Sequence, residues 1–157
     1  MLRIDADARV LETEETWEFM DDRDRKYRPE IVGSVNEAGS MDEYWLVDGT
    51  LRLKSRNVGK DTPLESRELR DVAIRLKHMD ELNIDIQVIF PTIFIIPLTP
   101  RPEIELALCR SYNRWMGECW RQSDNRLRWV AVVPLLSTDQ VYEEAQQSKE
   151  NGAVGIY

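Results

Sequence analysis

The chain opens with Ile4-Asp5-Ala6-Asp7-Ala8-Arg9-Val10-Leu11-Glu12, a stretch with the alternation of a β-strand. In an extended strand Asp5, Asp7 and Arg9 project to one face, and the alanines and branched apolar residues project to the other. Acidic side chains repeated near the end of a first buried strand suit a metal ion or a polar substrate at the mouth of an α/β fold. The sequence therefore predicts that a site begins at this strand.

Helix and strand patterns alternate after residue 61. Helices are predicted from the capping pattern at 62–65 to Asn83, from about residue 100 through Cys119, and from the capping box at 137–140 to Gly152. Apolar, β-branched runs predict strands at 84–90, 129–133 and 153–157. Repeated strand–helix units favour parallel strands joined by right-handed crossovers. Both an open doubly wound sheet and a (β/α)8 barrel begin in this way. No glycine-rich phosphate loop follows the first strand, which argues against a nucleotide-binding Rossmann domain.

A long polar stretch, residues 12–61, separates the first strand from this alternation. It contains a predicted hairpin, in which Asp48-Gly49 is the turn between Tyr44–Val47 and Leu51–Leu53. A connection of this length is unusual inside a compact domain. We expect either a functional insertion that acts as a lid or a loop that merely covers one end of a barrel.

Composition restricts the class of protein. The 157 residues fit one domain, and a hydrophobic content of 42% is enough for a core. A formal net charge of −8, with basic residues interleaved among acids, argues against nucleic-acid binding. No apolar run approaches the ~20 residues of a membrane span, and no secretory signal is visible. Cys109 and Cys119 lie too far apart along one predicted helix to form a disulfide, so we expect a reduced, cytoplasmic protein.

Short motifs along the whole chain resemble the amidohydrolase-related family, in particular its metal-dependent decarboxylases, such as aminocarboxymuconate-semialdehyde decarboxylase and γ-resorcylate decarboxylase. The motifs that carry the resemblance are, in chain order, Ile4–Val10, Tyr44–Gly49, Met79–Asp85, Phe90–Thr92, Leu108–Trp115 and Asp124–Arg128. The resemblance implies that residues 1–157 form the N-terminal half of a (β/α)8 barrel, with parallel strands and the insertion at 12–61 after the first strand.

The resemblance also implies a divalent metal, zinc or manganese, at the carboxyl ends of the strands. Asp7 falls on the position of the first metal ligand, whereas Arg9 occupies the position where the second, a histidine, is expected. Arginine stays protonated and offers no lone pair to a metal. The remaining ligands would lie beyond Tyr157, and the single histidine, His78, sits late in a predicted helix. Asp5, Asp7 and Glu12 could form a carboxylate site for a hard cation, or they could pair with Arg9.

Functional expectations follow from this resemblance. The parent activity is metal-dependent hydrolysis or nonoxidative decarboxylation of a small, often aromatic, carboxylic acid, and this chain by itself is expected to be a truncated, inactive form. Arg9 and Arg52 are the candidate substrate-binding residues, with Lys54 and Arg56 as further basic residues of the insertion. Two non-catalytic alternatives stay open. One is a half-barrel that assembles with a second copy or a complementary half, and the other is an open α/β binding module.

Overall fold

A parallel sheet forms the centre of the computed structural model, which describes residues 1–35, 41–54 and 62–157. Its strands, in spatial order, are β1 (Ile4–Arg9), β5 (Ile86–Phe90), β6 (Leu127–Ala131) and β7 (Ala153–Ile156). Each neighbouring pair runs parallel, and chain order equals spatial order. The predicted parallel strands are confirmed. β1 and β7 are the two edges of this sheet within the described residues.

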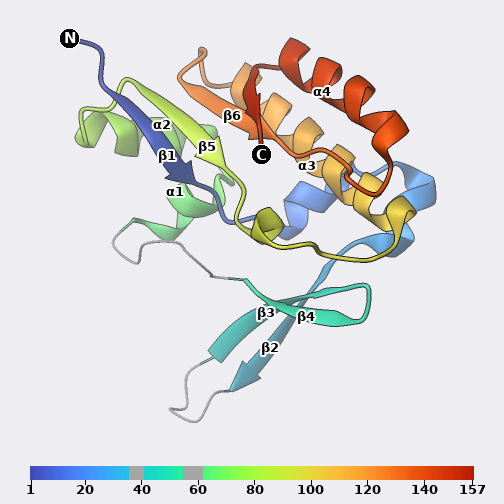
Figure 1. Cartoon of the computed structure of the whole chain (residues 1–157). Coiled ribbons are helices and arrows are strands. Elements are labelled where there is room, and N and C mark those ends of the chain that lie inside the picture. The colour runs from blue at the N-terminus through green and yellow to red at the C-terminus, as the bar shows by residue number, and fades with distance from the viewer. Residues whose placement is uncertain (36–40, 55–61) are drawn as a thin grey trace.

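Helices follow the strands and cover one face of the sheet (Figure 1). They are α1 (Leu64–Glu68), α2 (Val72–Glu81), α3 (Pro102–Arg121) and α4 (Val141–Glu150). The main core lies between this layer and the strands, where Ile89 and Trp129 of the sheet meet Met79 and Met116 of the helices, all fully buried. On the opposite face Ile4, which is aligned with Ile86, is more than half exposed. That face corresponds to the interior of a barrel.

Two local predictions for the helices are wrong. The helix expected from Thr62 to Asn83 is two helices, because Leu69 adopts a left-handed conformation (φ 51°) and turns its side chain into the core. Asp71 then caps α2 by accepting a hydrogen bond from the amide of Ala73 at 2.8 Å. The capping box at Ser137 is also absent, since the chain forms a short 3₁₀ turn there without a side-chain cap.

The predicted turn residues behave as expected elsewhere. Asn83 ends α2 in the left-handed region, with φ 55°. Gly152 follows α4 with φ 89°, a conformation that glycine adopts without strain. Cys109 and Cys119 are both buried and free. No helix in the described part of the chain is long and apolar enough to cross a bilayer.

The insertion folds as a second, antiparallel sheet preceded by two 3₁₀ helices (Glu14–Phe19 and Asp22–Tyr27). The sheet has the order β2 (Glu30–Val35), β3 (Met41–Val47), β4 (Thr50–Leu53). The predicted hairpin is confirmed, with positive φ at Asp48 and Gly49. Strand β2 was not predicted.

The small sheet lies on the side toward which β1 and β5 run (Figure 1). A second hydrophobic cluster fastens it there, in which Trp17 and Trp45 meet edge to face at 5.8 Å and pack with Ile93 and Leu108. The insertion therefore stands beside the carboxyl end of β5, a position that suits either a lid or a loop that covers this end of a barrel. The assignment of residues 12–61 as a lid stays a prediction.

Candidate functional site

A β-bulge in β1 changes which side chains share a face. Asp5 lies opposite Gln87 and Arg9 lies opposite Phe90, with a register shift between Asp5 and Ala8. Gln87 is buried under the helices, whereas Phe90 belongs to the open face, because residues three apart on a strand point to opposite sides. The prediction that Asp5 and Arg9 project to one face is therefore wrong. The extra residue of the bulge reverses the alternation, which sequence periodicity does not reveal.

Arg9 lies at the carboxyl end of β1, with 28% of its side chain exposed. Its guanidinium pairs with Asp7 at 3.1 Å and donates to the carbonyl of Pro91 at 3.4 Å. The guanidinium also lies over the ring of Phe90, with 5.2 Å from Cζ to the ring centroid. A positive charge with an aromatic platform thus stands at the end of the sheet where sites of parallel α/β folds are found.

The acidic residues of the first strand have separate partners. Asp7 pairs with Arg9 and is 78% exposed. Asp5 accepts a hydrogen bond from Gln87 Nε2 at 2.9 Å. Glu12 accepts hydrogen bonds from the amides of the loop after β5. The expectation that these three acids pair with Arg9 therefore holds for Asp7 alone.

The donor set does not fit a bound metal. Across residues 1–35, 41–54 and 62–157, no three histidine, cysteine or acidic side chains are close enough together to hold an ion. His78 Nδ1 instead lies 3.2 Å from Ser66 Oγ, between α1 and α2. Arg9, at the expected histidine position, offers no lone pair. Asp7 as a metal ligand stays a prediction.

Glu12 connects the end of β1 to the end of β5. Its carboxylate accepts from the amides of Thr92 at 2.9 Å and Ile93 at 3.1 Å, and Thr92 Oγ1 donates to the carbonyl of Val10 at 2.6 Å. Burial raises the pKa of Glu12 to about 7, although the two amide donors act in the opposite direction. Glu12 therefore holds the strand ends in place.

Phe90 and Tyr157 extend the site across the sheet. Their rings meet edge to face with centroids 6.1 Å apart. Tyr157 is held by its amide, which donates to the carbonyl of Ala131 at 2.8 Å. Neither aromatic was predicted as a site residue. The available signal was their position, since each stands at or directly after the end of a predicted strand.

Arg52 on β4 reaches the loop that follows β5. One of its terminal nitrogens donates to the carbonyl of Pro97 at 3.4 Å, and its Nε is buried without a hydrogen-bond partner in the described residues. It lines a small cavity of about 110 Å³ together with Thr92 and Ile93. Lys54, by contrast, is buried between two carboxylates, and Arg56 lies outside the described residues. Arg52 thus retains a buried donor that no described residue satisfies.

Solved amidohydrolases share this architecture. An amidohydrolase from Mycobacterium avium subsp. paratuberculosis K-10 superposes with a TM-score of 0.69 and 16% identity, over 97% of this chain and 48% of its own. A 2,6-dihydroxybenzoate decarboxylase from Rhizobium superposes with a TM-score of 0.56 and 18% identity, over 99% of this chain and 38% of its own. A 2,6-dihydroxybenzoate decarboxylase in complex with 2,6-dihydroxybenzoate superposes with a TM-score of 0.55 and 19% identity. No family model and no curated protein matches the sequence.

The fold is that of the N-terminal half of an amidohydrolase-type (β/α)8 barrel. The chain spans less than half the length of these amidohydrolase structures. The predicted fold class is therefore confirmed, with the long insertion placed after the first strand. In such a barrel the face that carries Arg9 and Phe90 points to the interior, and the carboxyl ends of the strands form the mouth.

Proposed function

We propose that this chain provides the carboxylate-binding part of an amidohydrolase-type site for a small, aromatic carboxylic acid. The observation that carries the proposal is the position of Arg9, whose guanidinium lies over Phe90 at the carboxyl end of β1. The 2,6-dihydroxybenzoate decarboxylases, similar in fold, support an aromatic acid as the substrate class.

The chemistry of Arg9 suits this function. A guanidinium binds a carboxylate through two parallel hydrogen bonds, which fixes the orientation of the acid as well as its charge. The present partner, Asp7, is 78% exposed, and exposed ion pairs contribute at most about 1 kcal/mol. A substrate carboxylate can therefore compete with Asp7 for the guanidinium. Phe90 beside it favours a flat, aromatic body for the acid.

Arg52 provides a second positive charge beside the same loop. Its buried Nε lacks a partner in the described residues, and an unpaired buried donor is costly. A second oxygen of the substrate would satisfy it. We assign Arg52 as the residue of the insertion that contacts the substrate when the lid is closed.

Turnover requires groups that the described residues do not bring together. The parent reaction is metal-assisted hydrolysis or nonoxidative decarboxylation, in which a metal polarises a substrate oxygen or activates water. Since Arg9 replaces an expected ligand, we propose that this chain alone binds the acid without converting it. Added zinc or manganese should leave hydrolysis and carbon dioxide release at background, and turnover by the chain alone would overturn this part of the proposal.

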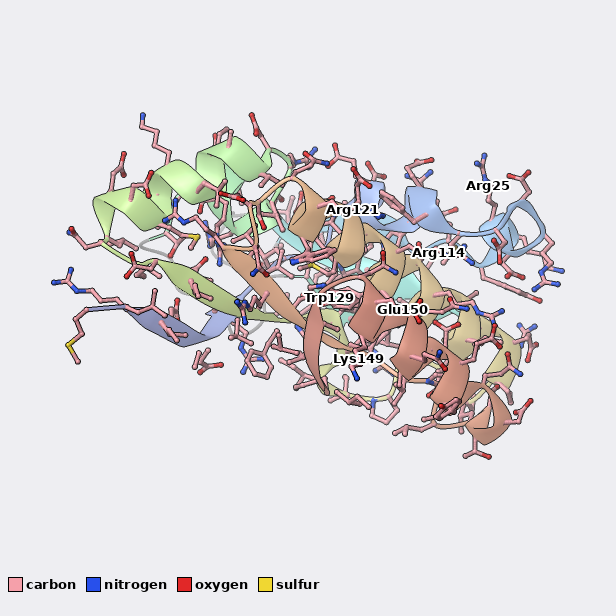
Figure 2. The ribbon with its side chains drawn as sticks, turned by 90° about the horizontal axis from the view of Figure 1, so that it is seen from above. Arg25, Arg114, Arg121, Trp129, Lys149 and Glu150 are labelled. Atoms are coloured by element: carbon pink, nitrogen blue, oxygen red, sulfur yellow. The ribbon has the colours of Figure 1, made fainter. Side chains whose placement is uncertain are left out.

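Titration with benzoate and 2,6-dihydroxybenzoate tests the binding function, with isothermal calorimetry or NMR as the readout. The variant Arg9→Gln should weaken binding about tenfold or more, because a charge-assisted hydrogen bond is lost. The matched control is Arg25→Gln, since Arg25 is 60% exposed and lies far from β1 (Figure 2). Equal affinity of the two variants, or no binding by the unaltered chain, would contradict the proposal.

A non-catalytic function is the second candidate, favoured by the two exposed sheet edges. Val154 and Ile156 of β7 are 52% and 58% exposed, and edge strands with apolar side chains readily pair with another chain. In this proposal the half-barrel binds a second copy or a complementary half. Size-exclusion chromatography with native mass spectrometry distinguishes it from an open α/β binding module, which would remain a monomer.

A further inference from the structure

An apolar pocket lies beside the proposed carboxylate site. The segments that follow β5 and β6 line it together with Tyr157 and the first turns of α3, and its volume is about 270 Å³. Its lining includes Phe94, Leu98, Val133, Leu135 and Tyr157. The pocket is therefore at the mouth of the sheet and has the size of one aromatic ring with a short chain attached.

Two aromatic rings connect this pocket to Arg9. Tyr157 lines the pocket and meets Phe90 with centroids 6.1 Å apart. Phe90 in turn lies beneath the guanidinium of Arg9, at 5.2 Å. The cation and the pocket are thus two ring contacts apart. A single-ring acid such as benzoate is too short to occupy both.

The charges at the two ends of this surface decide the orientation of a bound acid. Arg9 provides a positive charge at one end, and Glu105 on α3 provides a carboxylate in the lining of the pocket at the other. Glu105 is held in place by the amide of Leu136, which donates to its Oε2 at 2.7 Å. An acid would therefore place its carboxylate at Arg9, since Glu105 repels a second carboxylate in the pocket.

We propose that the pocket binds the apolar end of an elongated arylalkanoic acid whose carboxylate lies on Arg9. This inference rests on the proposed function of Arg9 and makes its substrate class more specific. The ligand has a carboxylate at one end, a chain that passes over Phe90 and Tyr157, and an aromatic ring in the pocket. Single-ring benzoates would then bind at Arg9 and Phe90 without reaching the pocket.

A comparison of benzoate with 4-phenylbutanoate tests the inference. The longer acid should bind about tenfold more tightly, because it buries additional methylene groups and moves its ring into the pocket. Val133→Phe fills the pocket, and Leu135→Asp places a charge on its rim at a residue that is 71% exposed. Each variant should reduce the affinity for 4-phenylbutanoate to that for benzoate, without changing benzoate binding.

The matched control is Leu64→Asp, which adds the same charge at an exposed leucine of α1, outside the pocket lining. It should leave the affinities for both acids unchanged. If both acids bind equally well and both depend on Arg9, the inference is overturned and the proposed function stands. If neither acid binds, the proposed function fails. Because Leu135 is exposed, its variant remains informative even if Val133→Phe does not fold.

Discussion

The buried carboxylate of Glu12 accepts a hydrogen bond from the backbone amide of Thr92, at 2.9 Å. This contact joins the segment after β1 to the segment after β5, and so fixes the relative position of the strand ends that carry Arg9 and Phe90. A site at the end of a sheet depends on such contacts, because its loops position the side chains of the site accurately only when the loops themselves are held in place.

The first prediction concerns the pH dependence of stability. Burial raises the pKa of Glu12 from 4.5 to about 7. Between these two pH values the folded state therefore keeps the Glu12 proton, whereas the unfolded state loses it. Its contribution to stability is fully present below about pH 4.5 and is lost as the pH rises through about 7, an effect of about 3 kcal/mol. Urea unfolding of Glu12→Gln, which cannot ionise, should lack this decrease between pH 5 and pH 8. The same pH dependence in both proteins would refute the assignment to Glu12.

The second prediction concerns Arg75, which joins two helices to two strands from a buried position. It donates to Gln87 Oε1 at 2.7 Å and to the carbonyls of Ser66 at 2.8 Å and Arg9 at 3.3 Å. Arg75→Met should lower the free energy of unfolding by about 3 kcal/mol, since it leaves several buried acceptors unpaired. Lys77→Met, an exposed change on the same helix, is the control and should cost less than about 0.5 kcal/mol. Chemical denaturation measures both, and similar values would argue against this structural role.

The third prediction separates backbone strain from steric overlap at two glycines. Gly152 has φ 89°, and a Cβ there would overlap the indole of Trp120. Gly49 has φ 76°, but a Cβ there would meet no atom within 4 Å. Gly49→Ala should cost about 1 kcal/mol through strain alone. Gly152→Ala should cost clearly more, about 3 kcal/mol, because the Trp120 ring must also move. Thermal unfolding measures the difference in stability between the two variants. Equal costs would mean that the Trp120 ring moves aside without a loss of stability.

The sequence predicts those features of this fold that depend on residues close in the chain. The runs at 84–90 and 129–133 are apolar enough to mark buried strands, and Asp48-Gly49 marks its turn. The bulge in β1 leaves no such trace, because its effect appears only when Arg9 is aligned with Phe90. The break at Leu69 is also hidden, since leucine favours the helix that its neighbours predict.

The candidate site is predictable only in part for the same reason. The pattern of the first strand identifies Arg9 and Asp7, and their ion pair is local. Phe90 and Tyr157 join them through contacts between distant parts of the chain. The role of Glu12 depends on its hydrogen bonds with amides of the loop after β5. The presence of an acidic residue near the end of a strand does not by itself predict these partners. Burial and long-range partners decide these roles, and neither is encoded in periodicity.

The last prediction concerns the attachment of the insertion through Lys54. The ammonium of this buried residue lies 2.9 Å from Glu43 on β3 and 3.3 Å from Glu68 on α1, and Arg70 also pairs with Glu68 at 2.7 Å. Lys54→Met removes one of the two cationic partners of the buried Glu68 carboxylate, and Arg70 remains as the other, so we expect a loss of about 2 kcal/mol. We expect a loosened insertion, seen as faster proteolysis within residues 41–54.

Arg28→Met is the matched control for Lys54→Met, because it removes an insertion residue whose ion pair with Glu18 is exposed, at 36% and 52%. Such surface pairs contribute less than about 1 kcal/mol, so its proteolysis should match that of the unaltered chain. The double variant Lys54→Met with Glu68→Gln should lose less stability than the sum of the two single variants, since that sum counts the contact between the two side chains twice. Additive losses in the double variant would show instead that the two side chains act independently, and that the contact between Lys54 and α1 does not hold the insertion in place.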